Sequence, residues 1–438
     1  MSRVSISSNG KGEFLEGIDV RDPEFEDWLR AYRQTDSKDN PPEAQFVHAA
    51  PKKAGPPARD LKIAIRTRAM TSGHVEWFLQ LFSDATALQL REYFSIDLIM
   101  DGSSDDLRDT LTVDLEAIGL DNNTLGVRIS LNAPENSRQI WAANRHLKSN
   151  GGPPVETAEA TRLLNELVQA IGDTLLQGGD LSGELDTPDA LCRNAIRSLF
   201  TMKKDCVAEA DRLFAKAFDL EPRGLYMAWR AQIKAIQFVE RHSSNREGLK
   251  DAGREFAARA LEIEPNNSMV LATLANTTGH LLQDKSRSLF LAKRGVLLNP
   301  ANPMAWWALA SAHVYAGDEK MSYAVARNAR NLAILSPHRF WWDNQLFGAA
   351  LTQGKIDEAR KLAEEARAQN AVFRPSLRYL IAFYANDDRH EDALQVAEDL
   401  KVLEPDFTIE RLVKDREYPA SLLHRSPGLD LKKVSALI

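Results

Sequence analysis

Apolar residues alternate with polar ones over several short runs between Leu61 and about Leu176. The runs LKIAIR and IDLIMD predict strands, and LTVDLEAIGLDNNTLGVRISLNAPENSRQIWAANRHL predicts antiparallel strands joined by turns. HVEWFLQLFSDATALQLREYF and VETAEATRLLNELVQAIGDTLLQ have the period of amphipathic helices. The order strand, helix, strands, helix predicts one small α/β domain over residues 61–180. One side of the first helix is expected to consist of Trp77, Leu81, Ala85 and Leu88.

The stretch 187–412 has a helical period almost throughout, and small residues and prolines recur in it at regular intervals. Ala359 and Ala393 are 34 residues apart, and Pro265 and Pro300 are 35 residues apart. Small residues let two helices approach closely, and the proline ends the second helix of each pair. This is the period of the tetratricopeptide repeat. It predicts an all-α solenoid of about five to six helix pairs with a concave face.

Two aromatic pairs, in AWWAL and FWWDN, fall in consecutive repeats. In the repeat frame Trp306 packs inside its own helix pair, whereas Trp307 and Trp341 fall where the first helix faces the groove. A mixed aromatic and polar groove holds an extended peptide or a helix, with aromatic side chains as anchors. The alternative is that both pairs serve only the packing of helices. The candidate groove residues are Tyr226, Trp229, Asn276, His280, Trp307, Tyr315, Trp341, Asn344 and Arg378.

A short apolar segment, EFLEGIDVRDPEFEDWLRAYRQ, stands out in the polar N-terminal region 1–34. Asp22 suits a helix N-cap and Pro23 the first helical position, and apolar residues follow on one helix face. Such a short helix is not stable alone, so we expect it to dock on this chain or on a partner. Residues 35–60 predict an extended Pro-rich linker, and residues 413–438 a C-terminal tail. The candidate docking residues are Phe14, Phe25, Trp28 and Leu29.

The composition is that of a globular protein, with 44% hydrophobic and 27% charged residues among 438, which is too long for a single core. A net charge of −7 argues against a general nucleic-acid or anionic-membrane surface. The two cysteines, Cys192 and Cys206, provide neither a disulfide framework nor a metal site. No stretch has the length of a signal peptide or a membrane span. We therefore expect a cytoplasmic protein without membrane attachment or direct nucleic-acid binding.

Catalytic patterns are missing from the sequence. It contains no GxGxxG, GxxxxGK[ST], HExxH or GxSxG, and its nine histidines have no metal-ligand spacing. The carboxylates of EFEDW are accounted for by the dipole at a helix start. The sequence therefore predicts no enzyme activity, no cofactor and no metal.

From about residue 13 the chain resembles the C-terminal part of a large bacterial group. Those proteins join an output domain, either winged-helix DNA-binding or class III adenylate cyclase, to a TolB-like α/β domain and a tetratricopeptide array. LGVRISLNAPENSRQIWAANRHL resembles the TolB-like strands, and ILSPHRFWWDNQLFGAALTQGKIDEA and LEPDFTIERLVKD resemble the last repeats and tail. FLEGIDVRDPEFEDWLRAYR resembles a segment that follows the winged-helix domain. The resemblance implies an α+β protein, with a small TolB-like α/β domain followed by an all-α tetratricopeptide solenoid.

Only 13 residues precede this last segment, so we expect the DNA-binding or cyclase domain to be absent, and its supply by a partner is left open. The resemblance predicts a non-enzymatic regulatory protein that acts through protein contacts in its groove and is linked to transcription or signalling. A partner that carries a DNA-binding domain is one form of this hypothesis. A scaffold of another cytoplasmic assembly and an enzyme related to adenylate cyclases are the alternatives. The enzyme is disfavoured because no metal-binding aspartate pair stands in a cyclase-like domain.

Overall fold

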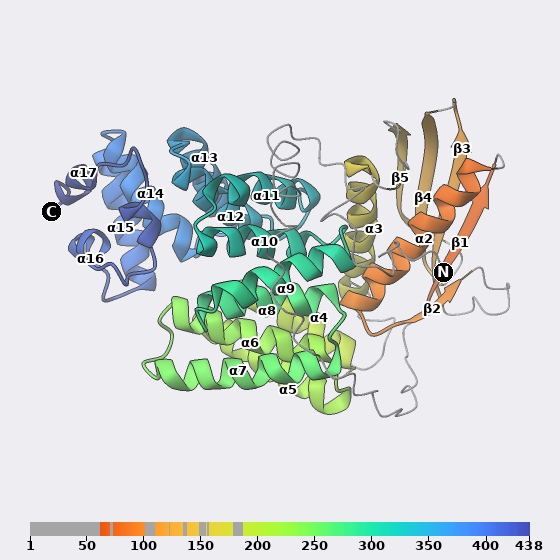
Figure 1. Ribbon diagram of the computed structural model, residues 1–438, viewed down its shortest axis with the longest axis horizontal. Coiled ribbons are helices and arrows are strands. Elements are labelled where there is room, and N and C mark those ends of the chain that lie inside the picture. Colours follow the sequence, from red (N-terminus) through yellow and green to blue (C-terminus); the bar gives the residue numbers. More distant parts are fainter. Residues whose placement is uncertain are drawn as a thin grey trace, which may run out of the picture. The chain divides into compact units, whose positions relative to one another are not determined.

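The computed structural model describes residues 62–70, 73–100, 110–121, 123–134, 138–148, 155, 157–177 and 187–438 (Figure 1). The expected docking segment with Phe14, Phe25, Trp28 and Leu29, and the expected linker 35–60, lie outside the described residues. The chain divides into two compact units, each with its own packing. The first is Met1–Leu185 with Leu297–Asn302, and the second is Asp186–Val296 with Pro303–Ile438.

The first unit contains a five-stranded sheet with the order β2-β1-β3-β4-β5. β1 pairs in parallel with β2 and β3, whereas β3–β4 and β4–β5 are antiparallel. Helix α2 makes the crossover from β1 to β2 that a parallel pair requires. The strands and the two helices expected from the sequence are confirmed. Their bounds are β1 Lys62–Ala69, α2 His74–Tyr93, β2 Asp97–Met100, β3 Leu111–Gly119, β4 Thr124–Asn132, β5 Gln139–Lys148 and α3 Ala158–Gln177.

One core joins this sheet to α2 and α3, because alternate strand residues point toward the helices. Ile65, Val113 and Ile129 from the strands meet Leu167 from α3 in this core. Each of them is almost completely buried. The first unit thus has a core of its own, as a small α/β domain requires.

The prediction that Trp77, Leu81, Ala85 and Leu88 form the apolar side of α2 is wrong. Trp77 and Leu88 are 51% and 40% exposed, whereas Phe78 and Phe82 are fully buried. The helix carries two apolar stripes, and the buried one adds Val75, Leu79 and Leu90 to the two phenyl rings. Burying that stripe removes more apolar surface from water, which decides which side faces the sheet.

The second unit is helical, and its residues 188–403 form six successive helix pairs (Figure 1). The first helices of consecutive pairs pack on one another, α6 on α8, α8 on α10 and α10 on α12. The all-α solenoid predicted from the repeat spacing is confirmed. The pairs are α4 Pro188–Leu199 and α5 Lys204–Leu220, α6 Gly224–Val239 and α7 Arg246–Ile263, α8 Ser268–His280 and α9 Lys285–Leu298, α10 Pro303–Ala316 and α11 Glu319–Leu332, α12 Phe340–Thr352 and α13 Ile356–Gln369, and α14 Arg374–Asn386 and α15 His390–Leu403.

The turn within each pair contains one residue with a left-handed backbone. Gly317 and Gly354 occupy this position in two pairs, with φ of 82° and 71°. In five of the six pairs the next residue donates its N–H to a carbonyl of the first helix, as Asp318 does to the His313 carbonyl at 3.0 Å. This helix ending reverses the chain between the two helices. The corresponding residues of the other four pairs are Met202, Arg241, Gln283 and Asp388.

We expect Gly317→Ala to destabilise the second unit by about 1 kcal/mol, because a left-handed backbone costs an L-residue ~1–2 kcal/mol and the stiffer unfolded chain offsets ~0.4–1 kcal/mol. A Cβ at Gly317 would meet no atom within 4 Å, so no steric clash adds to these two backbone effects. Urea unfolding followed by tryptophan fluorescence provides the measurement. Gly295→Ala is the control, because Gly295 lies in the regular helix α9 and its φ is not positive. A Cβ there would lie 3.4 Å from the nearest atom, the Ser268 carbonyl oxygen. Equal losses in both variants would contradict the argument.

The residues after α15 pack back onto the repeats. They form α16 (Ile409–Lys414), the 3-10 helix η3 (Ser421–His424) and α17 (Leu431–Ser435). Val434 is fully buried, and the Asp430 N–H donates to Asn386 Oδ1 at 2.8 Å. The segment that the sequence marks as a tail is therefore part of the folded second unit.

The solenoid curves so far that its early turns meet its late repeats. Phe200, in the turn of the first pair, stacks on His338 with ring centroids 4.3 Å apart and lies edge-on to Trp341 at 5.6 Å. Glu240, just after α6, accepts a hydrogen bond from Arg378 of α14, which is 138 residues away in the sequence. An extended solenoid joins only neighbouring repeats. These contacts instead join early turns to late repeats across the concave face.

Candidate functional site

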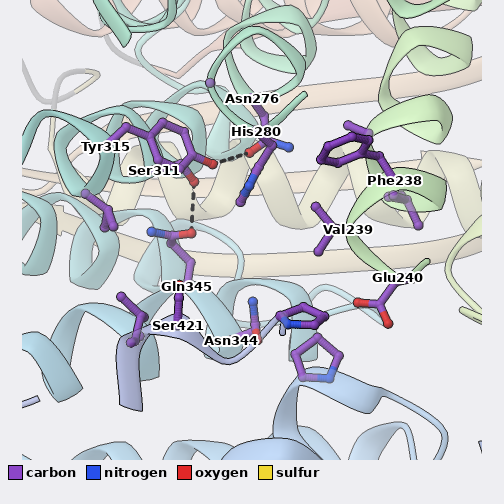
Figure 2. Close-up of a pocket in the computed structure, with 18 of the residues that line it drawn as sticks. Phe238, Val239, Glu240, Asn276, His280, Ser311, Tyr315, Asn344, Gln345 and Ser421 are labelled. Atoms are coloured by element: carbon purple, nitrogen blue, oxygen red, sulfur yellow. Dashed lines mark hydrogen bonds between the residues drawn. The ribbon is translucent and has the colours of Figure 1, made fainter. Parts of the chain in front are cut away.

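The concave face of the second unit contains a cavity of about 650 Å³ that is partly open to solvent (Figure 2). Residues of α6, α8, α10, α12 and α14 line it, together with residues of the C-terminal segment 416–425. Its volume falls within the ~300–1,000 Å³ of ordinary ligand sites. Seven of the nine candidate groove residues border it, namely Asn276, His280, Trp307, Tyr315, Trp341, Asn344 and Arg378.

The two aromatic pairs divide their roles. Trp307 and Trp341 border the cavity with ring centroids 5.3 Å apart. Their neighbours Trp306 and Trp342 pack between helices, and the Trp342 indole N–H donates to the Pro303 carbonyl at 3.2 Å. The sequence left open whether these pairs line the groove or only pack helices. In each pair one tryptophan borders the cavity and the other packs between helices.

Hydrogen bonds tie the polar residues of the wall to one another (Figure 2). The Asn276 amide donates to Gln232 Oε1 at 3.0 Å, and its Oδ1 accepts from the Tyr315 hydroxyl at 3.3 Å. The Ser311 hydroxyl donates to Gln345 Oε1 at 2.9 Å. Burial raises the pKa of Tyr315 well above its ordinary value, so this hydroxyl stays protonated as a donor. The wall is thus held in place by its own contacts, as a preorganised binding site requires.

Other polar groups of the wall keep hydrogen-bonding capacity. Asn344, the amide nitrogen of Gln345 and the ring nitrogens of His280 have no hydrogen-bond partner in the described part of the chain. Figure 2 shows His280 and Asn344 pointing into the cavity. An extended polypeptide presents the N–H and C=O groups that such side chains pair with.

Tyr226 and Trp229 do not border the cavity, so their assignment to the groove is wrong. Tyr226 is among the largest fully buried side chains. Trp229 stacks on Phe214 of α5 with ring centroids 6.2 Å apart. The interval from Pro222 to Pro265 is 43 residues, so a frame set on the regular repeats shifts across this pair. The aromatic side chains of α6 consequently face its helix neighbours.

Arg378 borders the cavity, but its guanidinium is paired with carboxylates of the protein. It donates to Glu240 Oε2 at 2.8 Å and to Glu404 Oε1 at 3.0 Å from Nε. Only 1% of the Arg378 side chain and 5% of the Glu240 side chain are exposed. Arg378 therefore joins α14 to the end of α6 and to the residue after α15, and its role is in closing the solenoid.

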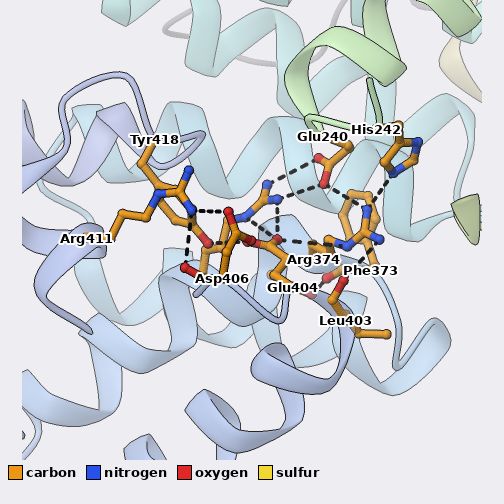
Figure 3. Close-up of polar contacts among 11 residues, drawn as sticks. Glu240, His242, Phe373, Arg374, Leu403, Glu404, Asp406, Arg411 and Tyr418 are labelled. Carbon is orange, nitrogen blue, oxygen red and sulfur yellow. Dashed lines mark hydrogen bonds and ion pairs between the residues drawn. The ribbon is translucent and has the colours of Figure 1, made fainter. Parts of the chain in front are cut away.

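Further polar contacts surround this buried pair (Figure 3). Arg374 donates to His242 Nε2 at 2.7 Å, and the Tyr418 hydroxyl bonds Glu404. Burial, together with the Arg374 guanidinium, lowers the pKa of His242 to about 4, so the ring accepts as a neutral imidazole. Burial alone would raise the pKa of Glu240, but Arg378 and Arg374 hold it below its ordinary value. Two arginines and two glutamates thus form one charge-balanced cluster.

The sequence analysis missed several cavity residues. Ser311 and Gln345 follow Trp307 and Trp341 by four residues, so they lie on the same helix faces. This spacing would have found them. The C-terminal residues around Tyr418 carry no repeat signal, and only the folded chain brings them to the cavity.

Among the described residues no group of three or more His, Cys, Asp or Glu side chains is placed to hold a metal ion. No helix within these ranges is both long and apolar enough to span a bilayer.

No protein-family model and no curated protein matches this sequence. Several solved structures are similar to this chain at low identity, including the following three. The Cut9–Hcn1 hetero-tetramer of the APC/C shares 14% identity over 62% of this chain and 47% of that chain, with a TM-score of 0.39, so the match spans about half of that protein. Yeast Tom70 shares 15% over 62% and 60%, with a TM-score of 0.33. YrrB, described as a TPR protein with an unusual peptide-binding site, shares 14% over 44% and 93%, with a TM-score of 0.28. The description of the second unit as a series of helix pairs therefore rests on its geometry and not on these similarities.

Proposed function

We propose that this protein is a non-enzymatic interaction protein, and that the cavity of its second unit binds an extended segment of a partner protein. One observation carries the proposal. On the concave face of the solenoid, an aromatic wall that contains Trp307 stands beside Asn344 and His280, whose side chains have no hydrogen-bond partner among the described residues. Aromatic anchors supply contact area, and amide and imidazole groups pair with a peptide backbone.

A cavity-filling substitution tests this proposal. Asn344→Trp places a large ring in the space that the segment would occupy, and Lys361→Trp places the same ring at an exposed position of α13. Proteins captured from native cells by the wild-type chain and by Lys361→Trp, but lost with Asn344→Trp, are the expected result. Thermal unfolding must show that Asn344→Trp remains folded. Capture that is equal in all three proteins would refute a role for the cavity.

A finer form of the proposal concerns the pathway. The resemblance of residues 61–180 to TolB-like domains, and of the repeats to those of bacterial winged-helix regulators, favours a cytoplasmic regulator linked to transcription or signalling. In that form the partner in the cavity carries a DNA-binding domain. Mass spectrometry of the captured proteins distinguishes it from a scaffold of a different assembly, whose partners would lack such a domain.

A further inference from the structure

The border of the cavity has a charge opposite to that of the whole protein. The chain carries a net charge of −7. Two glutamates border the cavity, Glu240 and Glu417, against six cationic side chains. The six are Arg241, Arg246, Lys285, Arg378, Arg416 and Arg425.

Three of these cations are neutralised by the protein itself. Arg378 binds Glu240, Arg241 lies 3.4 Å from Asp415, and Arg425 lies 3.6 Å from Glu319. These pairs hold the walls together and leave little charge for a ligand.

The other three cations have no carboxylate partner among the described residues. Arg246, Lys285 and Arg416 are all exposed, and Arg246 lies over the ring of Phe238, 3.7 Å from its centroid. Arg246 and Lys285 are the first residues of α7 and α9. A cation at a helix start is unfavourable, because the helix dipole is positive there. Helix formation therefore does not explain these two residues, and their charge adds to that of the dipole.

We propose that the cavity selects an acidic segment, an extended stretch of a partner protein whose carboxylates meet Arg246, Lys285 and Arg416. An apolar side chain of that segment packs on the aromatic wall that contains Trp307. This inference rests on the proposed function and specifies the chemistry of its ligand. Charge complementarity gives specificity and a faster approach of the partner.

Calorimetric titration of the full chain with blocked peptides tests the inference. The probe is acetyl-Asp-Glu-Phe-Asp-Glu-amide, and its neutral analogue replaces the acids by Asn and Gln. We expect the acidic peptide to bind at least tenfold more tightly than the neutral one at low salt. Raising the salt concentration should weaken the binding of the acidic peptide and not that of the neutral one, because salt screens interactions between exposed charges.

A triple variant, Arg246→Gln with Lys285→Gln and Arg416→Gln, is expected to lose at least tenfold in affinity for the acidic peptide. The control changes three exposed cations that do not border the cavity, Arg287, Lys320 and Lys361, to Gln and should bind like the wild type. Thermal unfolding verifies that both variants are folded.

Each other outcome overturns the inference. If the neutral peptide binds as tightly as the acidic one, and Asn344→Trp abolishes both, the proposed function stands and the acidic selectivity fails. If no peptide binds but native partners still require an open cavity, the ligand is not an acidic segment. If the acidic peptide binds only after Asp22, Glu24, Glu26 and Asp27 are changed to their amides, this chain's own segment is the occupant.

Discussion

Arg378→Ala is expected to destabilise the second unit by about 3–5 kcal/mol, because removing one partner of a buried ion pair leaves an uncompensated buried charge. Here Glu240 is 5% exposed and Glu404 12% exposed in their side chains, so neither gains much hydration. Urea unfolding followed by tryptophan fluorescence measures the loss. Five of the eight tryptophans report on this unit, namely Trp229, Trp306, Trp307, Trp341 and Trp342.

The size of this loss should depend on pH. In the wild type the lowered pKa of Glu240 contributes stability above its ordinary value of 4.5, and that contribution disappears as the pH falls through the folded pKa. Without Arg378, only Arg374 and His242 still oppose the effect of burial, so the pKa of this carboxyl rises and protonation in acid removes the buried charge more readily than in the wild type. The gap between variant and wild type should therefore be smaller at pH 5 than at pH 8. A gap that is equal at both values would refute the charge argument.

Two further variants separate burial from pairing. Arg367→Ala breaks the ion pair with Asp399, whose side chains are 31% and 39% exposed, and should cost less than about 1 kcal/mol. Combining Arg378→Met with Glu240→Gln removes both members of the buried pair and should recover part of the loss of Arg378→Ala.

Phe200→Ala is expected to cost about 3 kcal/mol, the lower end for a buried phenylalanine. The ring lies in the turn of the first helix pair, yet it contacts His338 and Trp341 near the start of α12. Its removal leaves a void between distant repeats. Amide hydrogen exchange should therefore rise at the start of α12 as well as around residue 200. Burial lowers the pKa of His338 to about 4, and uncovering the ring should move this pKa toward its ordinary value.

Phe290→Ala is the matched control, since Phe290 is 43% exposed on α9. Its cost should stay near the ~0.5 kcal/mol of ordinary surface substitutions. If Phe200→Ala were equally mild, and exchange in α12 were unchanged, the contact between early and late repeats would not stabilise the solenoid.

Closure of the solenoid links these two expectations to the proposed function. Phe200 and Arg378 lie in different repeats, and each joins an early turn to a late helix. The cavity walls come from both ends of the repeat unit, so loosening either contact should weaken ligand binding even though Phe200 does not border the cavity. The peptide titration of both variants checks this link.

Local patterns determined most of the secondary structure. Alternation predicted β3, β4 and β5, and the spacing of Ala359 and Ala393 predicted a helical repeat, because period 2 and period 3.6 are properties of the chain itself. The same spacing brought Trp307 and Trp341 to one wall, since equivalent residues of a solenoid share a face. The left-handed turn within each pair was not predicted, and only Gly317 and Gly354 place there the residue that such a backbone favours.

Only the tertiary structure decided which of several apolar stripes is buried and how far the solenoid bends. In α2, Phe78 and Phe82 are buried and Trp77 is exposed, because the sheet, whose strands lie elsewhere in the sequence, determines which face of the helix is covered. Tyr226 and Trp229 turned inward because one longer repeat shifts the frame. The pairing of Glu240 with Arg378 depends on a small rotation repeated from one helix pair to the next, and that rotation arises from packing between repeats. For the same physical reason, the sequence alone predicted most of the candidate groove residues but could not predict that early turns contact late repeats across the groove.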